Sequence, residues 1–300
     1  MTVTVLELIE ASAAQLEAAG LTFENGFGQG TTNAFDEAAW LVLWQLGLPL
    51  DDLDSVSNRP VAHAERAQVA TLLGARITTR QPAAYLTHEA WLMGVPFYVD
   101  ERVIIPRSFI AELLVDESID PWLSEDTRHV LDLCTGNGSL AVLAAMTYPN
   151  VLVDAADISL DALAVARINI DKHGLGSRIT LIESDGLAAC LGAKNGGYDL
   201  ILCNPPYVNA ASMAALPAEF RAEPTLALAG NMHGGSDGMD FIRSLFLTAA
   251  AQLNENAVLV LEIGNERDNF ERAFPHLEPL WFETSAGSDQ VMLITREQLV

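Results

Sequence analysis

The first third of the chain repeats apolar residues at the spacing of an amphipathic helix. Three such stripes occur, at positions 6–16, 40–44 and 69–77. Gly20 can end the first helix, Asn33 can cap the second, and the third stops before Pro82. We therefore predict a small helical bundle with these stripes in its core.

From Trp91 the apolar positions change to a strand-like pattern. The short runs 97–99 and 103–105 flank the polar pair Asp100-Glu101, and Pro106 follows. This pattern predicts a β-hairpin that ends at the proline. A helix over 109–115 is expected to lead into the rest of the chain.

From residue 130 onward, apolar strand-like runs alternate with helical stripes. The predicted strands are 130–133, 151–155, 179–183, 200–203 and 257–263, and the predicted helices are 140–146, 160–173 and 241–253. Such alternation predicts an α/β fold with a mainly parallel, doubly wound sheet. The last two runs, 281–283 and 291–294, flank a polar turn, which predicts an antiparallel pair at the end of the sheet.

Composition and charge limit the classes of partner. The 300 residues suit one large or two smaller domains, and the formal net charge is −24. An acidic surface repels nucleic acid and anionic membranes, and it suits a basic protein partner. The three cysteines are spaced for neither a disulfide framework nor a metal site. Neither a basic leader nor a run of ~20 apolar residues is visible, so we expect a cytoplasmic protein.

The loop after the apolar run 198–203 carries Asn204-Pro205-Pro206-Tyr207. Each proline fixes its own φ and keeps the preceding residue out of the helical region, so the loop is rigid and extended. In an open α/β sheet this loop lies at the carboxyl edge of the strands, where ligands bind. An amide side chain, a backbone carbonyl and an aromatic ring in a fixed array can hold a planar nitrogen group, either an amide or an amino-base.

A glycine-rich loop follows the predicted strand 130–133 and precedes a helix. It consists of Cys134-Thr135-Gly136-Asn137-Gly138. Ala141 takes the third position of the nucleotide-binding fingerprint, and Asp157 lies 19 residues after Gly138, where a carboxylate can accept hydrogen bonds from ribose hydroxyls. Both a dinucleotide and S-adenosylmethionine fit this pattern.

Two further carboxylates favour S-adenosylmethionine. Asp132 stands directly before the loop, where it could bind the methionyl ammonium group but would repel a pyrophosphate. Asp185 follows the strand 179–183, where it could accept a hydrogen bond from the adenine amino group, although it could equally cap a helix. The neighbouring residues Ile158 and Gly186 are assigned to the same cofactor site.

With these motifs, the chain resembles class I S-adenosylmethionine-dependent methyltransferases of the protein-glutamine N5-methyltransferase family. Its branch that acts on large-subunit ribosomal protein L-three is the most similar. The similarity covers nearly the whole chain and is carried by Tyr85-Leu86-Thr87-His88-Glu89-Ala90-Trp91, Ile105-Pro106-Arg107-Ser108, Glu223-Pro224 and the segments 97–103 and 293–299. Residues 231–236 depart from the family pattern as an insertion.

The resemblance implies a domain organisation and a reaction. Residues 1–88 would form a helical substrate-recognition domain, 89–108 a β-hairpin linker, and 109–300 a Rossmann-like methyltransferase domain. The enzyme would transfer a methyl group from S-adenosylmethionine to a glutamine side-chain amide of the basic ribosomal protein L-three, leaving S-adenosylhomocysteine.

The resemblance also implies roles at the catalytic loop. The Asn204 oxygen and the Pro205 carbonyl would accept hydrogen bonds from the substrate amide, and Tyr207 would pack on its flat face. Pro206 completes the catalytic set. His173 and His233 are the nearest candidate bases along the sequence.

Four other functions share parts of these motifs. The related release-factor glutamine methyltransferases differ in substrate, and adenine-N6 methyltransferases of DNA or RNA use the same Asn-Pro-Pro-Tyr array on an exocyclic amino group. The latter require a basic groove, which the net charge disfavours. An assembly factor without catalysis and a nicotinamide dehydrogenase are the remaining alternatives, and a dehydrogenase leaves the Asn204–Tyr207 loop unexplained.

Overall fold

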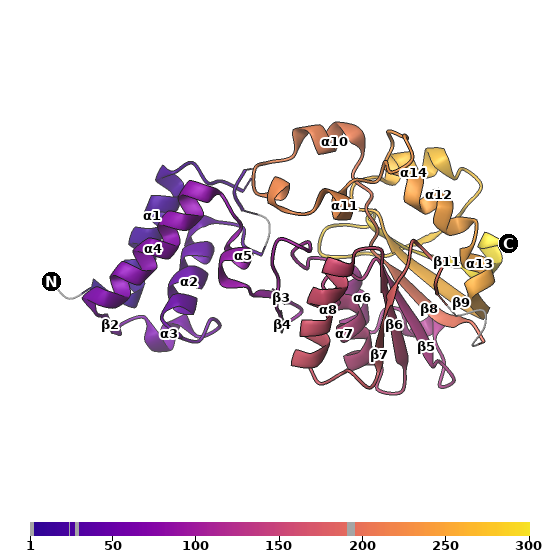
Figure 1. Ribbon diagram of the computed structural model, residues 1–300, viewed down its shortest axis with the longest axis horizontal. Helices are drawn as coiled ribbons and strands as arrows, with labels where there is room; N and C mark the ends of the chain where they lie inside the picture. The colour runs from indigo at the N-terminus through magenta and orange to yellow at the C-terminus, as the bar shows by residue number, and fades with distance from the viewer. Residues whose placement is uncertain (1–2, 24, 28–29, 191–195) are drawn as a thin grey trace. The chain divides into compact units, whose positions relative to one another are not determined.

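A computed structural model describes residues 3–23, 25–27, 30–190 and 196–300. The chain forms two compact units. Residues 1–90, 99–101 and 216–223 make up the first, here called the helical unit. Residues 91–98, 102–215 and 224–300 make up the second, here called the sheet unit. Figure 1 shows the elements of each.

The helical unit is built on the three predicted helices. They are α1 (Val5–Ala18), α2 (Ala34–Gln45) and α4 (His63–Thr79), accompanied by the short helices α3 (Leu53–Val56) and α5 (Ala83–Thr87) and the antiparallel strands β1 (Val3–Thr4) and β2 (Pro60–Val61). Asn33 caps α2 as predicted, because its Oδ1 accepts a hydrogen bond from the Asp36 amide at 2.9 Å. Ile9, Leu16 and Leu41 are among the buried residues that form the core.

The sheet unit contains one seven-stranded sheet. Its strands are β5 (His129–Leu133), β6 (Leu152–Asp157), β7 (Ile179–Glu183), β8 (Tyr198–Cys203), β9 (Leu253–Glu262), β10 (Leu280–Trp281) and β11 (Val291–Thr295). They lie in the order β10-β11-β9-β8-β5-β6-β7. The five strands β9, β8, β5, β6 and β7 are parallel to one another, whereas β11 pairs antiparallel with both β9 and β10. The predicted doubly wound sheet with a terminal antiparallel pair is confirmed.

Helices cover both faces of this sheet (Figure 1). α6 (Ile110–Val115), α7 (Ser139–Thr147) and α8 (Leu160–Lys172) pack on one face. α12 (Asp240–Phe246), α13 (Ala249–Gln252) and α14 (Arg267–Ala273) pack on the other. The short helices α10 (Ala210–Ala215) and α11 (Thr225–Leu228) and the 3-10 turns η1 (Asp120–Trp122), η2 (Phe220–Ala222) and η3 (Arg296–Leu299) complete the described elements. The single helix predicted over 241–253 is therefore wrong, because the chain turns at residues 247 and 248 between α12 and α13.

The predicted hairpin is displaced along the sequence. The two-stranded sheet is formed by β3 (Ala90–Leu92) and β4 (Val95–Phe97), with Met93 and Gly94 at φ values of 50° and 76° in the loop. Two consecutive positive φ values are typical of the tight turn that joins paired strands. Val103 and Ile105, predicted to lie in a strand, are buried without forming one. Their apolar alternation therefore reflects burial and not strand pairing.

The three cysteines are free thiols. Cys203 ends β8 and Cys134 follows β5 directly. Within the part of the chain that the structure describes, no helix is both long and apolar enough to cross a membrane.

Candidate functional site

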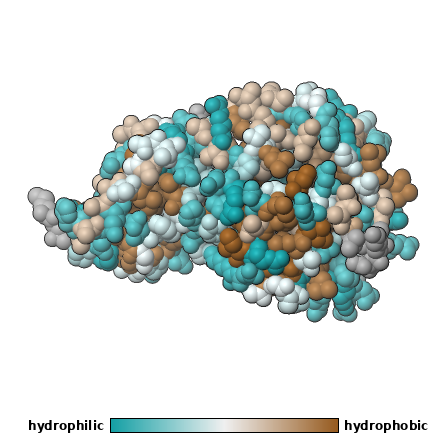
Figure 2. Space-filling view, viewed as in Figure 1, coloured by the Kyte–Doolittle hydropathy of each residue, from teal (hydrophilic) through white to brown (hydrophobic). Residues whose placement is uncertain are grey.

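A cavity of the sheet unit lies where β5, β6, β7 and β8 end. Ten of the residues predicted for the site line it: Cys134, Thr135, Gly136, Asn137, Asp157, Ile158, Asp185, Gly186, Asn204 and Pro206. Asp132, Gly138, Pro205 and Tyr207 are not part of its wall. In the view of Figure 2, apolar residues gather on the sheet unit around the places where Figure 1 labels α6, α8 and α11. The parallel strands thus bring four separate sequence motifs to one site.

The glycine-rich loop turns sharply between β5 and α7. Gly136 and Gly138 have φ values of 55° and 81°, which residues with a side chain rarely adopt. A Cβ on Gly138 would lie 3.1 Å from the Ala166 Cβ, so this glycine allows α8 to pack closely against the loop. A Cβ on Gly136 would meet no atom within 4 Å. The loop therefore leaves space for a ligand at Gly136.

Asp132 holds this loop from inside the protein. Its Oδ2 accepts hydrogen bonds from the Thr135 hydroxyl at 2.5 Å and from the Ala141 amide at 2.9 Å. The carboxyl is buried, and burial raises its pKa to about 7. These bonds tie the loop to the first turn of α7. Direct contact between Asp132 and a ligand ammonium group stays a prediction.

Asn137 links the loop to a second part of the cavity wall. Its Nδ2 donates to the Ile104 carbonyl at 3.3 Å, and its Oδ1 accepts from the Ser139 amide at 2.9 Å. The Asn137 carbonyl in turn accepts from Nδ2 of the fully buried Asn169 on α8 at 2.9 Å. One amide side chain therefore supports the start of α7 and the segment that carries Ile104.

Asp157 ends β6 with its carboxylate held in place. Oδ2 accepts a hydrogen bond from the Gly136 amide and Oδ1 accepts one from the Ser159 amide, both at 2.9 Å. Burial is the main cause that raises the pKa of this half-buried group. A carboxylate oxygen can accept more than one hydrogen bond, so Asp157 keeps acceptor capacity for a ligand.

Asp185 and Gly186 follow β7 in a turn that Ser184 stabilises. The Ser184 hydroxyl donates to the Gly186 carbonyl at 2.7 Å and accepts from the Ala189 amide at 2.9 Å. Asp185 is exposed and lines the cavity. Its carboxylate is placed on the wall next to the end of β6, because β6 and β7 are parallel neighbours.

The loop Asn204–Tyr207 is packed against three glycines that are distant in the sequence. A Cβ on Gly238 would lie 2.1 Å from the Tyr207 carbonyl oxygen, and one on Gly230 would lie 2.8 Å from the Tyr207 carbonyl carbon. A Cβ on Gly264 would lie 2.7 Å from Cε2 of the Tyr207 ring. The backbone and the ring of Tyr207 are therefore fixed by close contacts that only glycine permits.

The predicted insertion at 231–236 is a closed turn beside this loop. The Asn231 Oδ1 accepts from the Gly238 amide at 2.8 Å. The Asp240 Oδ2 accepts from the amides of His233 and Gly235 at 2.9 and 3.0 Å. The turn places Met232 on the cavity wall. That residues 231–236 are an insertion stays a prediction.

Part of the wall comes from the segment predicted to be a linker. Arg102, Pro106, Arg107 and Ser108 all line the cavity. Glu262 on β9 fixes this segment, because its carboxylate accepts from the Ser108 hydroxyl at 2.6 Å and from the amide of residue 109 at 2.9 Å. Burial raises the pKa of Glu262 to about 7. The motif Ile105-Pro106-Arg107-Ser108, which resembles the family, is the sequence signal that could have predicted this part of the wall.

Neither candidate histidine lies on the cavity wall. His173 packs against Phe97 with ring centroids 5.4 Å apart, and its Nε2 lies 3.0 Å from the Pro96 carbonyl oxygen. His233 is exposed in the turn described above. Neither histidine therefore lies where it could act as a base on a ligand in the cavity.

Comparison with known proteins agrees with this geometry. The family model of the Methyltransferase small domain matches residues 111–231, which include the glycine-rich loop, Asp157 and the Asn204–Tyr207 loop. Among solved structures, the catalytic domain of hMettl16 in complex with MAT2A 3'UTR hairpin 1 aligns with a TM-score of 0.51 at 14% identity, covering 79% of this chain and 83% of that chain. Similarity at this identity shows the fold alone, and it supports the predicted methyltransferase architecture.

Curated relatives match the full length of the chain. The ribosomal protein uL3 glutamine methyltransferase of Bordetella pertussis is 50% identical over 99% of this chain and 96% of its own length. The proteins of the same name from Neisseria meningitidis serogroup A and Bradyrhizobium diazoefficiens are 47% and 43% identical, over 94% and 92% of their own lengths. The chain therefore belongs to the family of the ribosomal protein uL3 glutamine methyltransferases.

Proposed function

We propose that this protein transfers a methyl group from S-adenosylmethionine to the side-chain amide nitrogen of a glutamine in ribosomal protein uL3. One observation carries the proposal. Asn204 and Pro206 lie on the wall of the same cavity as the glycine-rich loop and Asp157. Residues that could accept hydrogen bonds from a substrate amide thus share one cavity with residues suited to bind a nucleoside. The relatives that match along nearly the whole chain are uL3 glutamine methyltransferases by name, which supports the choice of substrate.

The described residues fit S-adenosylmethionine. The open space at Gly136 accommodates a ligand close to the loop backbone. Asp157, Ile158 and Asp185 line the cavity. In the proposed complex Asp157 would accept hydrogen bonds from the ribose hydroxyls, and Asp185 would accept one from the adenine amino group. When bound, the cofactor supplies a methyl group on a sulfonium, which is the electrophile of the reaction.

The Asn204–Tyr207 loop orients the nucleophile. An amide nitrogen is a poor nucleophile because its lone pair is delocalised into the carbonyl. The Asn204 side-chain oxygen and the Pro205 carbonyl would accept from the substrate N–H groups and hold the nitrogen at near-attack distance. Positive charge develops on nitrogen in the transition state, so these fixed acceptors bind it more strongly there. Tyr207 would stack on the flat amide, and its contact with Gly264 fixes the ring.

Proton release needs no residue of the protein in this scheme. Among the described residues that line the cavity there is no histidine. Methylation makes the amide nitrogen strongly acidic, so water can accept its proton. In this scheme the protein accelerates the reaction by positioning the substrate amide and by stabilising the charge that develops on its nitrogen.

The helical unit is proposed to select the protein substrate. In the predicted division, domain 1–88 would bind the substrate, 89–108 would link the domains, and 109–300 would carry out methyl transfer. The net charge of −24 complements a basic ribosomal protein. We infer that the reaction takes place in the cytoplasm, where ribosomal proteins are made.

The decisive experiment supplies labelled S-adenosylmethionine with uL3, with release factors and with nucleic acids in separate reactions. Label on one glutamine of uL3, located by mass spectrometry, is the expected result. Label on a release factor or on an adenine would refute the proposed substrate. The Asn204→Ala variant serves as the control for chemistry. We expect it to lose roughly 2–4 kcal/mol of transition-state stabilisation, as for removal of a fixed electrostatic partner. Its affinity for the cofactor should stay within about twofold.

A further inference from the structure

A segment from the second half of the chain belongs to the helical unit. Residues 216–223, which contain η2, are grouped with residues 1–90. On both sides of this segment the chain lines the cavity of the sheet unit. Pro206 precedes the segment, and Pro224 and Leu226 follow it. The middle of the connection between two parts of the cavity wall is thus held by the helical unit.

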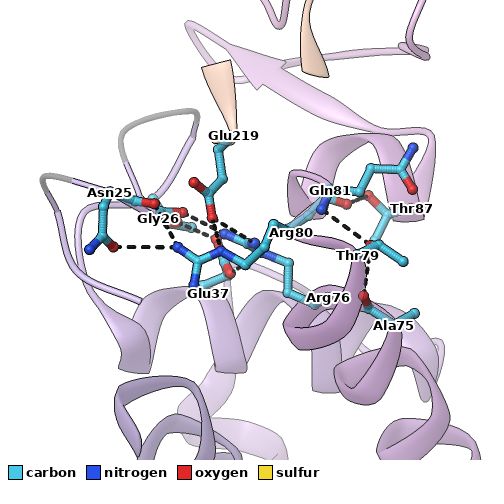
Figure 3. A network of polar contacts seen from close by, with 12 residues as sticks. Asn25, Gly26, Glu37, Ala75, Arg76, Thr79, Arg80, Gln81, Thr87 and Glu219 are labelled. Atoms are coloured by element: carbon cyan, nitrogen blue, oxygen red, sulfur yellow. Dashed lines mark hydrogen bonds and ion pairs between the residues drawn. The ribbon is translucent and has the colours of Figure 1, made fainter. Parts of the chain in front are cut away.

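A buried arginine of α4 lies at the centre of a polar network in the helical unit (Figure 3). Arg76 is 1% exposed. Its Nε donates to Glu37 at 2.7 Å, its Nη2 donates to the Gly26 carbonyl at 2.5 Å, and its Nη1 donates to Oε1 of Glu219 at 3.3 Å. Glu219 is the member of this network that comes from residues 216–223.

Glu219 is bound by two guanidinium groups. Besides Arg76, the Nε of Arg80 lies 2.7 Å from Glu219 Oε1. The Glu219 side chain is 1% exposed, whereas that of Arg80 is 28% exposed. Burial of a carboxylate is tolerated only where cations pair with it, so the ion pairs hold this segment specifically.

Arg76 has two partners besides Glu219. Glu37 and Gly26 bind Arg76 within residues 1–90, so the core of the helical unit keeps its own ion pair. Within residues 1–90, Arg76 is thus held at Nε and Nη2, and the contact at its Nη1 is the one that reaches residues 216–223. The added carboxylate has its main effect on the segment that carries it.

We propose that Glu219 is a positioning residue. Its ion pairs with Arg76 and Arg80 anchor residues 216–223 on the helical unit and thereby hold the flanking chain, from the Asn204–Tyr207 loop to Leu226, in the arrangement that methyl transfer requires. The kinetic part of this inference rests on the proposed function, while the anchoring itself does not.

Trypsin measures the anchoring directly. Arg221 is the only lysine or arginine between residues 195 and 242. Cleavage after Arg221 therefore reports release of this segment, and the fragments 1–221 and 222–300 identify it by mass. Glu219→Gln removes the charge and keeps the shape of the side chain. Glu65→Gln is the matched control, because Glu65 forms an ion pair with Arg59 at 2.6 Å on the surface of the same unit.

For Glu219→Gln we expect cleavage after Arg221 to become at least about tenfold faster, since a buried ion pair is lost. We expect kcat/KM for uL3 to fall by about tenfold or more, with cofactor affinity within about twofold of wild type. Glu219→Asp keeps the charge, so its resistance to cleavage after Arg221 and its kcat/KM should both lie between those of Glu219→Gln and the wild type. Glu65→Gln should match the wild type in every measurement.

Three outcomes would overturn the proposal: wild-type cleavage rates in Glu219→Gln, faster cleavage with unchanged kcat/KM, or equal effects in Glu65→Gln. If Glu219→Gln fails to fold, Arg80→Gln replaces it, because Arg80 is partly exposed and leaves the Arg76–Glu37 pair intact. If the wild-type protein is inactive on uL3, the proposed function is refuted instead. The proteolysis experiment then still tests whether Glu219 anchors residues 216–223, and kcat/KM is compared on the substrate that does become labelled.

Discussion

Replacing Gly264 with alanine tests whether the position of the Tyr207 ring controls catalysis. The new Cβ would lie 2.7 Å from Cε2 and 3.0 Å from Cζ of Tyr207, whereas ordinary contacts begin at 3.4 Å. The ring must therefore move by about 0.7 Å to restore contact distance. Misplacement by 1 Å at a reacting site can reduce the rate about 10²-fold, so we expect a loss in kcat of about 10- to 100-fold.

The same substitution also strains the backbone, and a control separates the two effects. Gly264 has a φ of +52°, which for alanine costs about 1–2 kcal/mol. Gly174, after α8, has a φ of +67° and no neighbouring atom within 4 Å of an added Cβ. Gly174→Ala should therefore show comparable destabilisation in thermal unfolding and keep its kcat.

Steady-state methyl transfer to uL3 and cofactor titration complete the test. We expect Gly264→Ala to bind S-adenosylmethionine within about twofold of wild type, because Gly264 does not line the cavity. Equal kcat values for Gly264→Ala and Gly174→Ala would refute the reasoning, since the displaced ring would then have no effect on the reaction.

Three further predictions concern the cofactor site and the surface charge. Asp157→Ala should weaken S-adenosylmethionine binding by roughly 1.5–3 kcal/mol in calorimetry, because charge-assisted hydrogen bonds to the ligand are lost; unchanged affinity would remove Asp157 from the site. The pKa of Asp132 is raised to about 7 in the folded state, whereas in the unfolded chain this group ionises at about pH 4. The unfolded state is therefore favoured increasingly as pH rises from about 4 to about 7. The melting temperature of Asp132→Asn relative to wild type should therefore increase over that range and then level off, and parallel profiles would contradict this assignment. Association with uL3 in stopped-flow measurements should slow as salt is raised, because the net charge of −24 attracts a basic partner; a flat salt dependence would exclude electrostatic steering.

The motifs of the site could be predicted because each is contiguous in the sequence. The glycine-rich loop and the Asn204–Tyr207 loop carry their own backbone constraints, in glycines and prolines, and the β/α alternation predicts that both lie at one edge of the sheet. The seven-stranded sheet and its antiparallel end followed from the same alternation of apolar and polar residues.

Other parts of the site depend on contacts between distant residues. No local pattern distinguishes Gly230, Gly238 and Gly264, which pack against Tyr207, from glycines in ordinary turns. The pairing of Glu219 with Arg76 joins positions 143 residues apart, and a glutamate is by itself expected to have an exposed side chain. The hairpin was misplaced because buried alternating residues at 103–105 imitate a strand.

The position of β11 has a consequence for how the protein is made. This strand comes last in the chain but lies inside the sheet, between β9 and β10, with five residues paired to β9. Until residue 295 has been synthesised, β9 therefore presents an unpaired apolar edge. At ribosomal speed the 33 residues from the end of β9 to the end of β11 take on the order of 2–7 s. Nascent chains are expected to be most vulnerable to aggregation and to chaperone capture during this interval.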